Sequence, residues 1–425
     1  MDVKKIIRYF YIGYTLYMIM VINTTNLRFF MILPSFLVMW INYFIFSLGY
    51  KVKKEKHETE LDPKLLDSWL INRKKSLLFL IASFSIMFST AAVKYYTGQT
   101  PVTVFKNLFS NISLYYEYQT YFAQQQRNIF SLRKLPFVLM LFYVKFILFY
   151  SYISFIIIKD KTTKFEKFYL EIITISYIYI GIARGTNFEF FELVMIIIFS
   201  ILYKFKVKRI KIRLKTLIVI PILVILMIYI FYWGLTRRGI IFKYYISRDV
   251  FYNPNGLIPL LFPFLSFVTL LIYGYFGFGF FYMSKFITEV WFSSFENFIA
   301  GILPLGFYAT EQTSITTIMK KVVDIGARWH PDTALFIGNF GYLGLLLLCF
   351  LMGASCKYFI KFRSSSSCFI NYIILMQMIS LPVGNFISTS SSNKLIVVSL
   401  ITYWIWKLYV SKIKTIKYNY NLTIK

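Results

Sequence analysis

Long apolar runs recur along the chain, separated by polar or basic segments. Each run reaches or approaches the roughly 18 residues that a helix needs to cross the hydrocarbon core of a bilayer. The pattern lacks the alternating segments of about ten residues that mark an outer-membrane barrel. It therefore predicts an all-α polytopic membrane protein that forms one integral membrane domain over residues 1–425. About ten spans are expected, at 6–22, 29–48, 77–93, 135–158, 168–183, 188–203, 216–233, 333–352, 369–386 and 395–410.

Lys and Arg orient these spans. The segments 51–75 and 204–215 are strongly basic, and basic residues also follow the fourth and the last span. Because short loops rich in Lys and Arg stay in the cytoplasm, both termini are predicted to be cytoplasmic. The same alternation makes residues 94–134 the first outer loop.

A long interval, 234–332, then has to begin and end on the outer side. It contains nine of the 19 glycines and five of the 11 prolines, around one strongly apolar stretch at 256–283. Backbone this irregular is tolerated at membrane depth only where protein or water covers it. We therefore expect a large outer loop with re-entrant or interfacial, partly buried helices. Two further full spans, giving twelve in all, are the alternative.

The composition agrees with this class. Apolar residues make up 58% of the chain and charged residues only 15%, which excludes an ordinary soluble domain and a disordered chain. The net charge of +29 would suggest nucleic acid in a soluble protein. Here basic inner loops account for most of the excess, and no nucleic-acid partner is expected.

Charged residues at the predicted outer ends of spans are more informative. Arg184 lies at the tight turn between the fifth and sixth spans, and Glu189 and Glu192 follow on one helix face. Charges within the membrane are costly and mark functional sites by default. The alternative is a purely structural pair of Arg184 with one of these glutamates. By contrast, Lys145 is the one cation deep inside a predicted span.

Two arginines, Arg237 and Arg238, follow the seventh span directly, and Arg248 lies further along the same segment. A guanidinium group presents a planar donor fork that matches phosphate oxygens. These arginines are therefore candidate phosphate ligands. Anchoring of a span end to lipid headgroups is the alternative reading.

A third cluster comprises Arg328, His330 and Asp332, just before the eighth span. An imidazole near a carboxylate can move protons. Two potential ligands do not make a metal site, so no metal is expected. The glycines that follow, in the segment 338–344, suit close helix packing.

A fourth cluster lies in the first outer loop. The segment 111–128 is rich in Tyr and Gln and carries Glu117. Aromatic faces and amide groups suit sugar rings and hydroxyls. An interfacial amphipathic helix with a tyrosine belt is the alternative.

Taken in this order, the clusters resemble the polymerases of bacterial O-antigen and capsular polysaccharide repeat units. The resemblance rests on ARGTNFEFFEL after the fifth span, TRRG after the seventh, and RWHPDTALFIGNFGYLGLLLLCFLMG near the C-terminus. It implies a multi-pass protein of the bacterial cytoplasmic (inner) membrane. The implied reaction moves a growing glycan from one undecaprenyl-pyrophosphate carrier to a fresh carrier-linked repeat unit at the outer face. It implies no cofactor, and a flippase and a chain-length regulator as partner proteins.

Within that resemblance, Arg237, Arg238 and Arg184 are expected to hold the pyrophosphate, whose negative charge grows as it leaves. His330 is the first candidate for orienting or activating the acceptor hydroxyl, with Glu117, Asp332 and Glu189 as alternatives. Glu192, Arg248 and Arg328 complete the expected substrate-binding set. A flippase for the same lipid-linked oligosaccharide and a ligase-like glycan transferase are the competing functions.

Overall fold

The computed structural model describes residues 3–52, 69–71, 73–110, 113–125, 132–159, 161–207, 214–237, 245–247, 250–289, 331–359, 364–384, 386, 390–403 and 405. The first part of the chain forms α1 (Val3–Thr24), α2 (Phe29–Lys51), α3 (Lys75–Thr97), α4 (Pro101–Leu108), α5 (Leu114–Gln124), the 3-10 turn η2 (Leu132–Lys134), α6 (Leu135–Tyr152), the π-helical turn η3 (Ile153–Ile158) and α7 (Lys164–Arg184). The rest forms α8 (Phe188–Val207), α9 (Leu214–Arg237), β1 (Tyr245–Ser247), β2 (Val250–Phe251), α10 (Leu257–Leu261), α11 (Pro263–Phe276), α12 (Phe278–Glu289), α15 (Asp332–Phe359) and α16 (Ser365–Val383). Another helical stretch covers residues 391–403.

Six helices in the described part of the chain are long and apolar enough to cross a membrane. They are α1, α2, α3, α6 continued by η3, the second part of α15 (Phe340–Phe359) and α16. A seventh results if α11 and α12, which meet at a 55° bend, form one span. The prediction of a helical multi-pass membrane protein is therefore confirmed. Helices α7, α8 and α9 form where three more spans were expected, and the count of ten stays a prediction.

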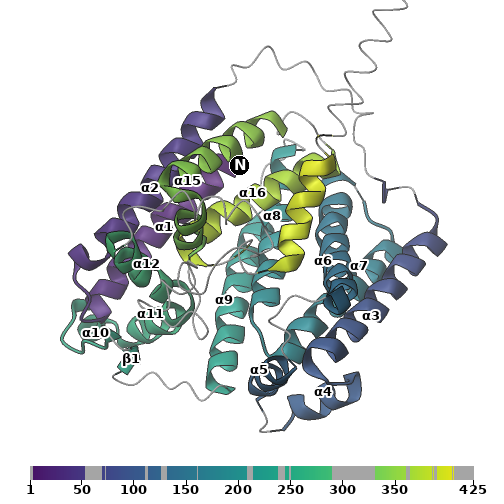
Figure 1. The fold of residues 1–425 in the computed structure, drawn as a ribbon, viewed down its shortest axis with the longest axis horizontal. Coiled ribbons are helices and arrows are strands. Elements are labelled where there is room, and N and C mark those ends of the chain that lie inside the picture. Colours follow the sequence, from purple (N-terminus) through teal and green to yellow (C-terminus); the bar gives the residue numbers. More distant parts are fainter. Residues whose placement is uncertain are drawn as a thin grey trace, which may run out of the picture.

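The core of the bundle is α16, which lies between the other helices (Figure 1). All its residues from Ser367 to Val383 are buried, against α1, α2, α6, α8 and α15 among others. Two buried amides on α16 find partners on other helices: Asn371 donates to the Tyr203 hydroxyl at 3.1 Å, and Gln377 donates to Asp332 at 2.9 Å. These bonds fix the rotation of the helix within an otherwise apolar core.

Glycines let α2 and α15 touch backbone to backbone. A Cβ added to Gly49 would overlap the carbonyl oxygen of Phe350, and one added to Gly353 would overlap that of Phe46. Small residues at such positions are a common means of close packing between membrane helices. In the 338–344 segment, by contrast, Gly341 has φ 71° and interrupts α15, so this glycine bends the chain.

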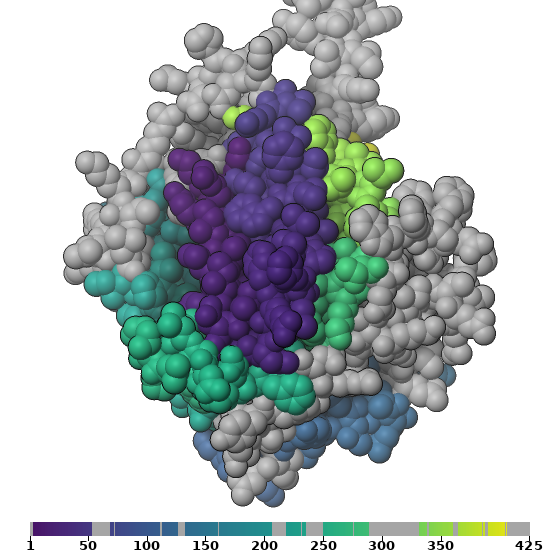
Figure 2. All heavy atoms as spheres, turned by 90° about the vertical axis from the view of Figure 1, so that its left-hand side faces the viewer, coloured from purple at the N-terminus to yellow at the C-terminus, as the bar shows by residue number. Residues whose placement is uncertain are grey.

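One face of the bundle is covered with exposed apolar side chains. Figure 2 shows α1 and α2 forming that face, with α10 and α11 along its lower edge. On α1, Leu16 is 57% exposed, and on α2 Phe30 and Phe44 are 81% and 60% exposed. In a protein of this class, a surface of this kind faces lipid hydrocarbon.

The segments predicted to form the first outer loop and the start of the large outer loop fold at the same end of the bundle, where Figure 1 shows α4, α5, α10 and β1. Strands β1 and β2 pair antiparallel, which adds a two-stranded ribbon to an otherwise helical fold. The ribbon continues to the α1–α2 connection, because Asn26 N–H donates to the Phe251 carbonyl at 3.0 Å and Thr25 bridges to Tyr252.

Helices α11 and α12 pack against α1 and α2. The hydroxyl of Tyr17 donates to the Thr269 carbonyl at 3.1 Å, and Tyr14, one turn deeper on α1, donates to the Phe276 carbonyl. The chain then turns into α12, whose Ser284 hydroxyl donates to that of Ser35 at 2.8 Å. The interval predicted as a large outer loop thus contains partly buried helices among its described residues.

Candidate functional site

The turn between α7 and α8 brings Arg184 and Glu189 together. Helix α7 ends at Gly185, whose φ of 59° lies in the left-handed region where glycine is favoured. Its N–H donates to the Ile182 carbonyl at 2.9 Å, which closes the helix. A Cβ at Gly185 would lie 2.6 Å from the backbone nitrogen of Tyr115, so α5 rests directly on this turn.

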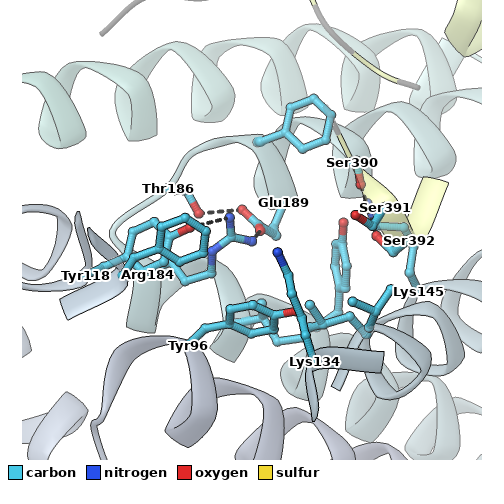
Figure 3. Close-up of a pocket in the computed structure, with 16 residues that line it drawn as sticks. Tyr96, Tyr118, Lys134, Lys145, Arg184, Thr186, Glu189, Ser390, Ser391 and Ser392 are labelled. Carbon is cyan, nitrogen blue, oxygen red and sulfur yellow. Dashed lines mark hydrogen bonds and ion pairs between the residues drawn. The ribbon is translucent and has the colours of Figure 1, made fainter. Parts of the chain in front are cut away.

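Two residues, Glu189 and Tyr118, hold Arg184 (Figure 3). Its Nη1 lies 2.8 Å from Oε1 of Glu189, and its Nη2 donates to the Tyr118 hydroxyl at 3.3 Å. The guanidinium carbon lies 5.0 Å from the centre of the Tyr118 ring, within the range of a cation–π contact. Thr186 donates to the other oxygen of Glu189 at 2.6 Å. The guanidinium is therefore fixed in place before any ligand arrives.

Arg184 lies in the wall of a cavity of about 300 Å³ between α3, α5, α6, α7, α8 and the start of the 391–403 helix. The side chain of Arg184 is 28% exposed, and so part of it is open to solvent. The other cavity residues comprise cations, aromatic residues and serines, together with the aliphatic Val138, Leu141 and Ile180 and the polar Thr186 and Glu189. They include Lys134, Lys145, Tyr96, Tyr118, Phe122, Tyr177, Phe188, Ser390, Ser391 and Ser392.

Lys145, which lines this cavity, belongs to a buried ion pair. Lys145 of α6 lies 2.8 Å from Oε2 of Glu192 on α8, and their side chains are 8% and 0% exposed. Lys145 also donates to the Asn393 side-chain oxygen at 2.8 Å, while the Asn393 amide donates to Glu192 at 3.1 Å. Tyr177 of α7 donates to the same carboxylate. Both charges are therefore compensated and hydrogen-bonded, as burial requires.

Asp332 continues this polar network at the start of α15. Its fully buried carboxylate accepts from Gln377 at 2.9 Å and from the Phe386 N–H at 3.0 Å. The Phe386 carbonyl in turn accepts from Asn393 at 2.7 Å. Asp332 thus fixes the connection after α16 that places Asn393 over the ion pair.

Glu117 joins the short helices of the first outer loop. Its Oε2 accepts from Gln99 at 2.5 Å and from Asn107 at 3.1 Å, which ties α5 to the corner between α3 and α4. The neighbouring Tyr118 is the residue that reaches Arg184. Glu117 therefore positions the helix that covers the cavity and does not itself line it.

Of the ten residues that the sequence proposed, the structure brings Arg184 and Glu189 into one contact and places Glu192 beneath them. Arg237 ends α9, and a Cβ on Gly234, one turn earlier, would lie 2.6 Å from the Asn187 amide nitrogen. The end of α9 therefore adjoins the α7–α8 turn. The remaining predicted residues lie outside the described part of the chain: Arg238, Arg248, Arg328 and His330.

The sequence interpretation missed Lys134, which lines the cavity at the start of α6, and three further contributors. Lys145 was recognised as a lone charge inside a span, and this was the available signal that it belongs to the site. The serines at 390–392 form a polar run between two apolar segments. Tyr118 was one of many tyrosines in its loop, and nothing in the sequence distinguished it.

The arrangement is suited to an anionic ligand that also carries hydroxyl groups. Arginine and lysine side chains bind phosphate oxygens, and tyrosine faces and serine hydroxyls suit sugars. Comparisons of the chain with models of known families, with curated proteins and with solved structures find no match.

Proposed function

We propose that this chain is a membrane glycosyltransferase of the repeat-unit polymerase type, acting on oligosaccharides linked to undecaprenyl pyrophosphate. In this proposal it lies in the bacterial cytoplasmic membrane with the cavity at the outer face. The observation that carries the proposal is the guanidinium of Arg184, held by Glu189 and Tyr118 in the wall of a cavity that two lysines also line.

Contacts between distant segments support the part of the proposal that places them on one side of the membrane. The segments that the charge pattern assigns to the outer face contact one another, although they are far apart in the sequence. These contacts join Thr25 to Tyr252, Tyr118 to Arg184, Asn187 to Gly234, and Asp332 to Phe386. Alternating spans require such segments to lie on one side, and the contacts satisfy this requirement.

In the proposed reaction, the acceptor hydroxyl attacks the anomeric carbon of the donor glycan, and the lipid diphosphate leaves with the bonding electrons. Negative charge grows on the diphosphate as the bond breaks. Cations fixed beforehand stabilise that charge more effectively than water does. Lys134 and Arg184 are suited to this role. Arg184 is paired with Glu189, as Lys145 is with Glu192, but its side chain is 28% exposed whereas that of Lys145 is 8% exposed. His330 remains the proposed group that orients the acceptor hydroxyl or activates it by accepting its proton.

The experiment is replacement of Arg184 in a strain that lacks the native gene. We expect Arg184→Ala to lower the polymerisation rate by about 10²–10³-fold, as loss of one fixed electrostatic group does. Arg184→Lys should recover part of the rate, because the charge remains while the two-sided grip is lost. Arg133→Ala is the matched control, since this exposed arginine of η2 does not line the cavity. Long glycan chains made normally by a well-expressed Arg184→Ala protein would refute the proposal.

A flippase for the same substrate is the second candidate, because a charged pair in the interior of a bundle is also typical of transport pathways. The accumulated intermediate separates the functions. Loss of a flippase leaves repeat units on the inner leaflet, whereas loss of a polymerase leaves single units on the outer leaflet. Loss of a ligase leaves finished polymer on its carrier.

A further inference from the structure

A second cavity, of about 490 Å³, lies on the opposite side of the α7–α8 turn. Residues 108–109 and 113–115, the end of α7, the start of α8 and the last turns of α9 enclose it. Its lining is mainly apolar and aromatic, with Phe109, Ile182, Phe190, Ile230 and Trp233 among its residues. The described residues that line it include no charged side chain. Such a cavity suits hydrocarbon.

The two cavities share a thin wall. Thr186 lines both of them, and the neighbouring Gly185 and Asn187 line the apolar one. Because Gly185 has no side chain, the backbone of Tyr115 packs directly onto the turn. A ligand that passes over these few residues would have one end beside the guanidinium of Arg184 and the other in apolar surroundings.

The apolar cavity opens beside a helix suited to the membrane surface. Helix α4 begins three residues after α3 ends, and Thr100 caps it by accepting from the Thr103 N–H at 3.3 Å. Val102, Phe105 and Phe109, spaced to share one helical face, are 78%, 67% and 75% exposed. A short helix with such a face at the end of a spanning helix lies in the interface with its apolar side in lipid. Phe109 belongs both to this face and to the cavity lining.

We propose that the apolar cavity binds the first part of the hydrocarbon chain of a polyprenyl diphosphate, whose diphosphate occupies the cavity of Arg184. The inference rests on the proposed function and deepens it by assigning a site to the carrier lipid. The chain enters past Phe109 and Trp233 from the bilayer. The Gly185–Asn187 turn then separates the apolar part of the ligand from its charged part.

This site contributes position more than affinity. The hydrocarbon chain leaves one apolar medium, the bilayer, for another, so the hydrophobic effect provides little driving force. A cavity that fixes the chain does, however, fix the bond between diphosphate and sugar relative to Arg184. Alignment of reacting groups is worth several orders of magnitude in rate. The test therefore asks where in the protein the hydrocarbon chain binds, and not how tightly.

The full-length protein in lipid nanodiscs is photolabelled with a polyprenyl diphosphate that carries a diazirine on the isoprene unit nearest the diphosphate. Labelled peptides are mapped by mass spectrometry. We expect labels in the segments 108–115 and 230–234, and loss of labelling when unlabelled polyprenyl diphosphate is in excess. Ser113→Trp, which fills the cavity, should lose most of this labelling. Tyr116→Trp, on the exposed side of the same helix, should keep it.

Leu108→Trp fills the cavity from the other side and replaces Ser113→Trp if that protein does not fold. Labelling that persists in a folded, cavity-filled variant overturns the inference, as does labelling elsewhere. Phosphatidylglycerol that competes as well as the polyprenyl diphosphate also overturns it, because the site then takes ordinary membrane lipid. Specific labelling together with normal glycan chains in an Arg184→Ala strain would refute the polymerase function and leave the lipid site standing.

Discussion

The buried pair of Lys145 and Glu192 gives the sharpest test of the fold. Replacing Lys145 by Met keeps the length of the side chain and removes its charge. The carboxylate of Glu192, 0% exposed, would then keep only the hydrogen bonds from Asn393 and Tyr177. Removal of one partner from a buried pair costs about 3–5 kcal/mol, because the other charge stays desolvated. Since two donors to the carboxylate remain, we expect a loss of about 3 kcal/mol in the free energy of unfolding.

The double variant Lys145→Met/Glu192→Gln separates charge from shape. The introduced amide would retain an oxygen for Asn393 while no charge remains in the core, so the double variant should be more stable than Lys145→Met alone. Both are compared with wild type by unfolding in mixed micelles at increasing SDS. Glu171→Gln, at an exposed position of α7, is the control and should change stability by less than about 0.5 kcal/mol. A Lys145→Met protein as stable as wild type would refute the reasoning that the pair is desolvated.

Two further perturbations test other parts of the structure. Gly353→Ala forces α15 away from α2 and should lower the free energy of unfolding by about 1–3 kcal/mol. Gly13→Ala is the control, because a Cβ added there meets nothing within 4 Å, and it should be neutral or stabilising. Equal effects of the two substitutions would contradict the packing described. Burial opposes ionisation of Glu166 at the start of α7, but hydrogen bonds from Lys159 and Thr163 outweigh it and lower the pKa of Glu166 below 4.5. The carboxylate therefore stabilises the fold above pH 4.5, and this contribution is lost as the pH falls toward the lowered pKa. Glu166→Gln should be less stable than wild type at pH 7, and its melting temperature should depend less on pH below pH 4.5. An unchanged pH profile would refute this.

Much of the helical layout follows from the sequence because a bilayer imposes a simple rule on apolar length. The runs at 6–22 and 29–48, for example, lie within α1 and α2. The rule fails where length is ambiguous. At 256–283 the apolar stretch is interrupted by Gly277, and α11 and α12 bend there instead of forming one straight helix. Apolar length alone does not reveal such a bend, and the prediction of irregular, partly buried helices in this interval came from its glycines and prolines.

The site was predictable only in part, for a related reason. Arg184 and Glu189 are five residues apart across a glycine turn, so their contact is local and the sequence indicated it. Lys145 meets Glu192 and Asn393 across 47 and 248 residues. No local sequence pattern specifies these contacts, since they depend on how α6, α8 and the 391–403 helix pack. Glu117 shows the converse: a carboxylate in a promising loop is engaged by two amides of its own loop.

The burial of α16 has a consequence for biogenesis. Tyr11, near the start of the chain, donates its hydroxyl at 2.7 Å to the carbonyl of Met378, 367 residues later. A ribosome has therefore added 367 residues after Tyr11 before α1 acquires this partner. Until then the helices already inserted lack their central helix, and lipid or a chaperone has to cover the surfaces that α16 later buries. A stop codon shortly before Ser365 would release a product that has the earlier helices but lacks the central helix α16. Such a product is a natural target for membrane quality-control proteases.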